Sequence, residues 1–94
     1  MTYLVGPVLV AGPRAQAVIG AIIESCPSAD VRSHGSYVRV GVAGRCVATR
    51  EALCRHAGGP FKLPGDLEAI MPSFRGRFCV TDEEAVWIAE EERP

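Results

Sequence analysis

The chain has 94 residues, enough for one domain with one hydrophobic core and too few for two. Hydrophobic residues make up 48% of it and charged residues 22%, a composition that is typical of a globular protein and excludes a wholly disordered chain. The net charge is −1 and the lysines and arginines are scattered, which disfavours a nucleic-acid-binding surface.

The first third of the chain predicts a strand, a helix and a second strand. Residues 3–11 contain a β-rich Val-Leu-Val sequence after Gly6 and Pro7, and the proline indicates an edge or a bend in this strand. Residues 13–25 begin with a proline at the preferred first helical position and carry apolar side chains at helical spacing, so we expect one face to pack on a sheet. Residues 29–33 can form a short strand.

Two further strands follow. Strict alternation over residues 37–42 directs the valines toward the core, and Tyr37 and Arg39 toward the opposite face. An Ala-Gly pair then predicts a hairpin turn into a strand at residues 45–48. The sequence therefore predicts three consecutive antiparallel strands.

A second helix and the long connection after it organise the chain. Thr49 is a favourable N-cap and Gly58 a favourable C-terminal glycine, which predicts a helix over residues 50–57. The stretch 58–78 then crosses the molecule with a single capped turn at residues 66–71. Because connections run over the surface, its apolar side chains favour contact with a partner, and the alternative is an ordinary connection docked on the core.

The chain ends in a predicted hairpin of strands 74–80 and 85–89, followed by residues 90–94, which we expect to fray. The element order β-α-β-β-β-α-β-β predicts an α+β fold, in which two helices pack on a mostly antiparallel sheet.

Charge is unevenly distributed along the chain. Residues 1–80 hold nine lysines and arginines against five acids, net +4, and residues 81–94 hold one arginine against six acids, net −5. This asymmetry favours an interface with separate basic and acidic zones. The alternative is a soluble surface with an acidic tail.

The four cysteines, Cys26, Cys46, Cys54 and Cys79, include no Cys-x-x-Cys pair. No signal peptide and no membrane span is recognisable, so we expect a cytoplasmic protein with reduced thiols.

Cys54 and His56 lack two further ligands at suitable spacing, and the chain has no phosphate loop or dinucleotide fingerprint. The sequence thus predicts no metal and no cofactor. An enzyme that uses Cys54 and His56 is disfavoured, since positions i and i+2 of a helix face different ways.

Three pieces of sequence, in this order, match one known family. They are Val5-Gly6-Pro7-Val8, Tyr37-Val38-Arg39-Val40, and Gly59-Pro60-Phe61 followed by Leu67-Glu68 and Ser73-Phe74-x-Gly76. Over about residues 4–89 the chain resembles the effector, or coupling, proteins of soluble bacterial diiron multicomponent monooxygenases. The toluene and alkene monooxygenase members are the most similar, and those of phenol hydroxylase and methane monooxygenase are more distant.

This resemblance implies a single effector domain over residues 1–94, without a cofactor and without catalytic activity of its own. Its implied partner is the diiron α subunit of the hydroxylase, on which it would tune oxygen activation, substrate access and the coupling of NADH use to hydroxylation or epoxidation of aromatic or alkene hydrocarbons. The resemblance further implies a monomer when free, with no nucleic-acid or membrane partner, and leaves room for competition with the ferredoxin or reductase.

The resemblance also implies a set of hydroxylase-interface residues. They are Val5, Gly6, Pro7, Ile70, Met71, Pro72, Ser73, Phe74 and Gly76. Family members commonly have asparagine in place of Ile70, so a hydrogen bond from that side chain does not carry over. Ile70 and Met71 belong to no helix or strand stripe; exposure would mark them as partner contacts, burial as core, and we expect Met71 to be the more exposed.

The competing hypothesis is a stand-alone α+β domain that senses a small molecule or mediates protein interactions. A sensor would need a ligand cavity between helix and sheet, and a domain of this size seldom has room for one beside a packed core.

Overall fold

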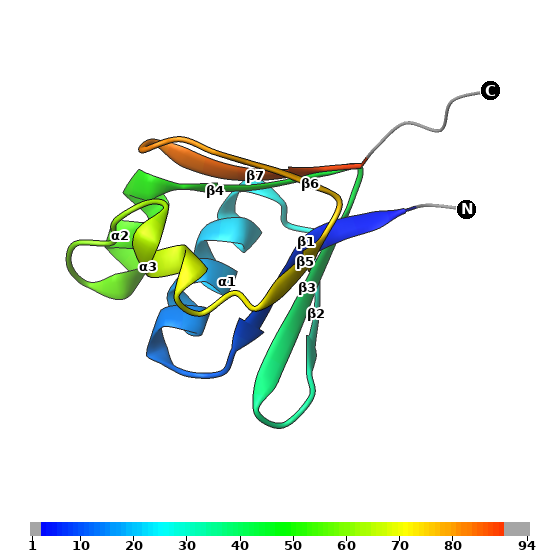
Figure 1. The fold of residues 1–94 in the computed structure, drawn as a ribbon, viewed down its shortest axis with the longest axis horizontal. Coiled ribbons are helices and arrows are strands. Elements are labelled where there is room, and N and C mark those ends of the chain that lie inside the picture. The colour runs from blue at the N-terminus through cyan, green and yellow to red at the C-terminus, as the bar shows by residue number, and fades with distance from the viewer. Residues whose placement is uncertain (1–2, 90–94) are drawn as a thin grey trace.

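Two antiparallel sheets frame the molecule (Figure 1). The computed structural model describes residues 3–89, so the predicted fraying of residues 90–94 lies outside the described part. The larger sheet has the strand order β2-β3-β1-β5, and the smaller sheet has the order β4-β7-β6. The strands are β1 (Leu4–Val10), β2 (Asp30–Ser33), β3 (Tyr37–Ala43), β4 (Arg45–Thr49), β5 (Ser73–Arg75), β6 (Arg77–Val80) and β7 (Glu84–Ile88).

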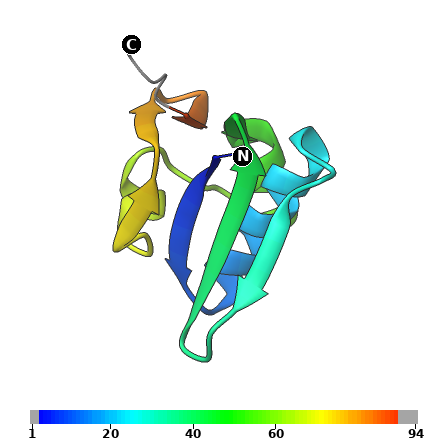
Figure 2. The same ribbon diagram turned by 90° about the vertical axis from the view of Figure 1, so that its right-hand side faces the viewer.

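Three helices within residues 3–89 lie in the angle between the two sheets (Figure 1). They are α1 (Pro13–Ser25), α2 (Arg50–Ala57) and α3 (Gly65–Glu68). Helix α1 lies behind the larger sheet in Figure 2 and also contacts α2 and β4, which makes it the centre of the fold. In the described part of the chain, no helix is long and apolar enough to cross a membrane.

The predicted bounds of the two long helices, α1 and α2, are confirmed. Helix α1 has the predicted bounds, with Pro13 in its first turn. At the start of α2 the Thr49 hydroxyl accepts a hydrogen bond from the Ala52 backbone N–H at 3.2 Å, and Gly58 ends the helix in the left-handed conformation at φ 73°. The capped turn expected at residues 66–71 is the one-turn helix α3.

The core fills the space between the sheets and the helices. Its largest fully buried side chains come from both sheets and all three helices: Trp87, Leu9, Ile22, Leu53, Leu67 and Val5. The connection between α2 and β5 adds Phe61 and Leu63 to this core. This part of the long connection is therefore docked on the core, as the alternative interpretation of the stretch predicted.

The α+β class and the antiparallel pairing are confirmed, but two details of the predicted sheet are wrong. The expected hairpin between residues 37–42 and 45–48 does not form, since β3 pairs with β1 and β2 while β4 pairs with β7. The Ala-Gly turn reverses the chain, yet Gly44 at φ 80° leads it from one sheet to the other. Strand β4 packs on α1 and α2, and tertiary packing of this kind overrides local turn preferences in the choice of a strand partner.

The single strand predicted over residues 74–80 is also wrong, because it divides at Gly76. Strand β5 pairs with β1 in the larger sheet, and β6 pairs with β7 in the smaller. Gly76 has φ 99°, and a Cβ there would lie 2.7 Å from Cγ1 of Val5 and 2.9 Å from the carbonyl oxygen of Ile88. A residue with a side chain would not fit this crossing, so glycine is what allows one segment to serve both sheets.

Candidate interaction surface

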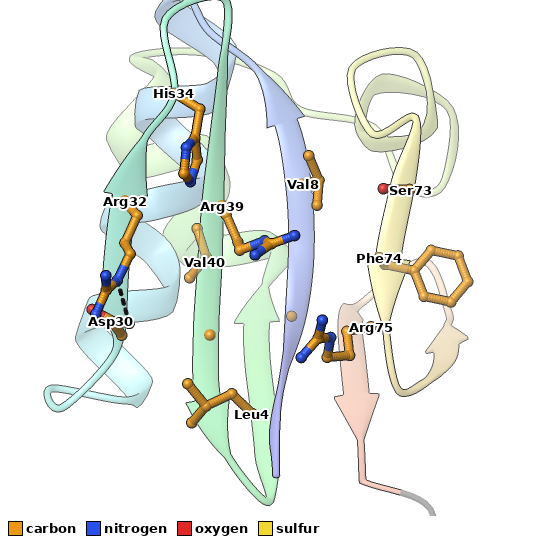
Figure 3. A pocket seen from close by; sticks show the side chains of 12 residues that line it. Leu4, Val8, Asp30, Arg32, His34, Arg39, Val40, Ser73, Phe74 and Arg75 are labelled. Atoms are coloured by element: carbon orange, nitrogen blue, oxygen red, sulfur yellow. Dashed lines mark hydrogen bonds and ion pairs between the residues drawn. The ribbon is translucent and has the colours of Figure 1, made fainter.

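The larger sheet has one face turned away from the helices, which we call the open face. Alternation along β1 places Val5, Pro7 and Leu9 against the core and leaves Gly6 and Val8 on the open face. Figure 3 looks onto this face, with the helices behind the strands. Its side chains come from strands β1, β2, β3 and β5 and from the turn after β2.

The open face is hollowed at its centre. A shallow hollow of about 520 Å³ is lined by residues of all four strands and by His34. Gly6 on β1 is one of the lining residues, and only glycine fits there, because a Cβ would lie 2.3 Å from the Val40 carbonyl oxygen. Gly41 on the neighbouring strand is less tightly enclosed, since an added Cβ would lie 3.2 Å from the Leu4 Cβ. Both glycines are buried, so no side chain rises from β1 or β3 at these two positions of the hollow.

Arginine dominates the electrostatics of the open face. Arg32 is paired with Asp30, its Nε lying 3.0 Å from the carboxylate oxygen. Arg39 and Arg75 have no carboxylate partner among residues 3–89. His34 stacks on Tyr37 with a ring-centroid distance of 5.4 Å. The face therefore carries an excess of positive charge beside its hollow.

The predicted interface residues near the N-terminus are mostly beneath this surface. Val5 and Pro7 are both fully buried, with their side chains facing the core. Only Gly6 reaches the open face, as the floor of the hollow. Pro7 lacks a backbone N–H, and the ladder between β1 and β3 is interrupted there, with Val5 and Val8 paired on either side. Val5 and Pro7 can therefore shape a docking surface without contacting a partner.

The second predicted group, residues 70–76, lies along the edge of the larger sheet. The Ile70 carbonyl accepts a hydrogen bond from the Val10 N–H at 2.8 Å, which ties the segment to β1. Pro72, Ser73 and Phe74 are exposed, and Phe74 keeps 45% of its surface accessible. Ser73 pairs with Val8, so its side chain joins the open face (Figure 3).

Met71 departs from expectation. We expected it to be more exposed than Ile70, but Met71 is only 9% exposed and belongs to the core cluster, while Ile70 is half-buried. The chain bends at Pro72, directly after the buried Met71. Sequence pattern alone cannot distinguish an inward from an outward loop residue. Met71 is a core residue and not an exposed anchor.

An aromatic row leads from this segment into the interior. The ring centroids of Phe74 and Phe78 are 5.3 Å apart, and those of Phe78 and Trp87 are 5.2 Å apart. Trp87 is fully buried, and its indole N–H has no hydrogen-bond partner among the described residues. The row crosses from β5 to β7 and joins the exposed edge of one sheet to the core side of the other.

The cysteines and His56 form no common site. The Cys54 Sγ lies 3.9 Å from the Phe61 carbonyl oxygen, whereas His56 Nε2 lies 2.5 Å from a Glu24 carboxylate oxygen. Hydrogen bonds from Arg55 and then from His56 lower the pKa of Glu24. Within residues 3–89, no group of three histidines, cysteines or acids is placed to hold a metal ion.

Sequence reasoning missed the arginine pair on the open face. Alternation correctly directed Arg39 away from the core, but nothing local indicated that β5, and with it Arg75, lies beside β1. The only available signal was the match of the Val-Gly-Pro-Val and Ser-Phe-x-Gly segments to one family. The structure places these two segments on adjacent strands.

Comparison with known proteins gives three findings. A sequence model described as the MmoB/DmpM family matches residues 3–88. The chain is 41% identical over 86 residues to the effector subunit of the alkene monooxygenase system of Xanthobacter autotrophicus (strain ATCC BAA-1158 / Py2), covering 89% of this chain and 84% of that protein. It also superposes, with a TM-score of 0.82 and 18% identity, on a chain in the structure of a phenol hydroxylase–regulatory protein complex, covering 94% of this chain and all of that one.

Proposed function

The chain belongs to the MmoB/DmpM family, and from this membership we propose that it binds the diiron hydroxylase of a toluene/alkene-type multicomponent monooxygenase and tunes its oxygen activation, substrate access and coupling. It is a regulatory component, not the oxygenase itself. The observation that carries the proposal is the identity with the alkene monooxygenase effector subunit across most of the chain. Its place of action is the cytoplasm, where it is a monomer until it meets the hydroxylase.

The docking surface in this proposal combines the exposed residues Pro72, Ser73 and Phe74 with the open face beside them. Gly6 contributes the floor of the hollow, and Gly76 sets the crossing that presents Phe74 at the sheet edge. Val5, Pro7 and Met71 support this surface from the core side. Ile70 is half-buried, and its carbonyl fastens the segment to β1.

Tuning by such a protein has a thermodynamic basis. A protein that supplies no redox group can change its partner only by binding two conformations of that partner with different affinity. The resulting coupling free energy is commonly about 1–3 kcal/mol, a change of roughly 5–150-fold in the balance between them. Competition with the ferredoxin or reductase for the same hydroxylase surface would follow if the surfaces overlap.

Reconstitution tests the proposal. Purified hydroxylase, reductase and ferredoxin of an alkene- or toluene-type system are assayed with and without this protein for product formed per NADH consumed. We expect a higher rate and tighter coupling when the protein is present at the concentration of the hydroxylase. The same rate and the same coupling without it would contradict the proposed function.

A pair of variants tests the docking surface. Phe74→Ala removes an exposed aromatic side chain from the proposed surface, and Ile23→Ala removes an apolar side chain of similar exposure, 43%, from α1. Loss of a central aromatic contact typically costs about 1–3 kcal/mol of binding. Titration of the hydroxylase should therefore show weaker binding for Phe74→Ala only. Equal affinity of the two variants, both with melting curves of folded protein, would remove this segment from the interface.

A further inference from the structure

The unpaired arginines of the open face lie on the two strands that flank β1. Arg39 on β3 is opposite Val8, and Arg75 on β5 is opposite Gly6, so β1 separates them by one strand on each side. From a strand spacing of about 4.8 Å and a rise of about 3.3 Å per residue, their Cα atoms are roughly 12 Å apart. Figure 3 shows both guanidinium groups turned toward β1 from opposite sides.

Between the two guanidinium groups, the backbone of β1 carries no side chain at Gly6. The buried position of Gly6 leaves no room for one, because an added Cβ would collide with the Val40 carbonyl. Val8, the next outward residue of β1, is half-buried. A small planar group can therefore reach the level of both arginines above β1.

The charge of Arg39 and Arg75 indicates which kind of chemical group would bind between them. Arg32 already has Asp30 as its partner, but Arg39 and Arg75 have none within residues 3–89. Two unpaired guanidinium groups over one floor favour an anion with planar, paired acceptors, and arginine binds carboxylates in this way with two parallel hydrogen bonds.

The surroundings favour a protein carboxylate over a free anion. The hollow is shallow and open. Leu4, which lines it, and Val10, which lies beside Val8 and Arg39 in the neighbouring hollow, are 37% and 48% exposed. A small anion would leave these apolar side chains in water, whereas a protein surface that carries the carboxylate would cover them. The arginines also lie next to Ser73 and Phe74 of the proposed docking surface.

We propose that Arg39 and Arg75 together hold one aspartate or glutamate side chain of the hydroxylase above Gly6. The inference rests on the proposed function, because the partner is the hydroxylase, and it adds the chemistry of the contact. Since both guanidinium groups bind the same carboxylate, removal of either one weakens the contact made by the other.

The test is a double-mutant cycle on hydroxylase binding. Arg39→Gln, Arg75→Gln and the double variant are titrated against the hydroxylase, with Arg50→Gln as the control. Arg50 is also exposed, but it pairs with Glu83 at 3.5 Å and begins α2, which lies away from the larger sheet (Figure 1). Each single variant should lose about tenfold or more in affinity, the typical effect of losing a hydrogen bond to a charged group. The double variant should lose less than the product of the two single losses.

The outcomes distinguish a failure of hydroxylase binding from a failure of the arginine–carboxylate contact. If the wild-type protein does not bind the hydroxylase, the proposed function fails and the inference falls with it. If the wild type binds and both arginine variants bind as well as Arg50→Gln, the proposed function stands and the arginine site is overturned. Two losses that simply multiply in the double variant would also overturn a single shared carboxylate. Unchanged melting temperatures show that each variant is folded.

Discussion

At Gly76 the chain crosses from the larger sheet to the smaller one. The loss of unfolding free energy in Gly76→Ala measures how strongly this crossing requires glycine. Gly76→Ala places a methyl group 2.7 Å from Cγ1 of Val5 and 2.9 Å from the Ile88 carbonyl, at φ 99°. The backbone strain costs about 1–3 kcal/mol, and the forced overlap in a packed region costs about 1–3 kcal/mol more. The expected loss of unfolding free energy is therefore roughly 2–6 kcal/mol, the sum of these two ranges.

Gly44→Ala is the matched control, because Gly44 also has a positive φ, 80°, but nothing lies within 4 Å of an added Cβ. It should cost only the conformational strain, about 1–2 kcal/mol. In a domain of this size 1 kcal/mol shifts Tm by about 4–8 °C, so thermal melting resolves the two variants readily. Equal losses for Gly76→Ala and Gly44→Ala would refute the argument that close packing at the crossing requires glycine.

Three further predictions concern the core and the titratable groups. Met71→Ala should cost about 2–5 kcal/mol in denaturant unfolding, because Met71 is only 9% exposed in the core; a loss below about 1 kcal/mol would make it a surface residue. Burial raises the pKa of the Cys46 thiol to about 12, so alkylation of the native protein at pH 8 should label the exposed Cys79 and spare Cys46, and mass spectrometry of the digested protein checks this. The lowered pKa of Glu24, held down first by Arg55, means that this carboxylate contributes stability above pH 4.5 that is lost as the pH falls further; in urea melts, Glu24→Gln should therefore lose less stability than the wild type between pH 5 and pH 3.

Local signals predicted the helices well, because each helix end depends on a few neighbouring residues. Thr49 and Gly58 determine α2 by hydrogen bonds and backbone conformation within one turn, and the structure has both as expected. Strand positions were also close, since period-2 alternation is a local property. The choice of strand partner is not local, and this is where the prediction of one sheet with a 45–48 hairpin was wrong.

The segment around Gly76 shows why some errors could not have been avoided. Phe74, Gly76 and Phe78 alternate as in one continuous strand, and the glycine itself is the local sign of a bulge or bend there. It does not show that the two halves join different sheets. The break becomes visible only when β1 and β7 are in place, because it is their Val5 and Ile88 that surround Gly76. The same reason explains why Arg39 and Arg75 could not be paired in advance, as they become neighbours only through β1.

The way the proposed docking segment is held suits a regulatory protein that acts by binding. Ser73 and Phe74 belong to a strand paired with β1, and the Ile70 carbonyl is bonded to Val10, so the segment is ordered before any partner arrives. Ordering a loop on binding would consume part of the interaction free energy, and a preformed edge avoids this loss. Under the proposed function, more of the binding free energy then remains available to favour one hydroxylase conformation over another, which is the only quantity through which a component without redox chemistry can act.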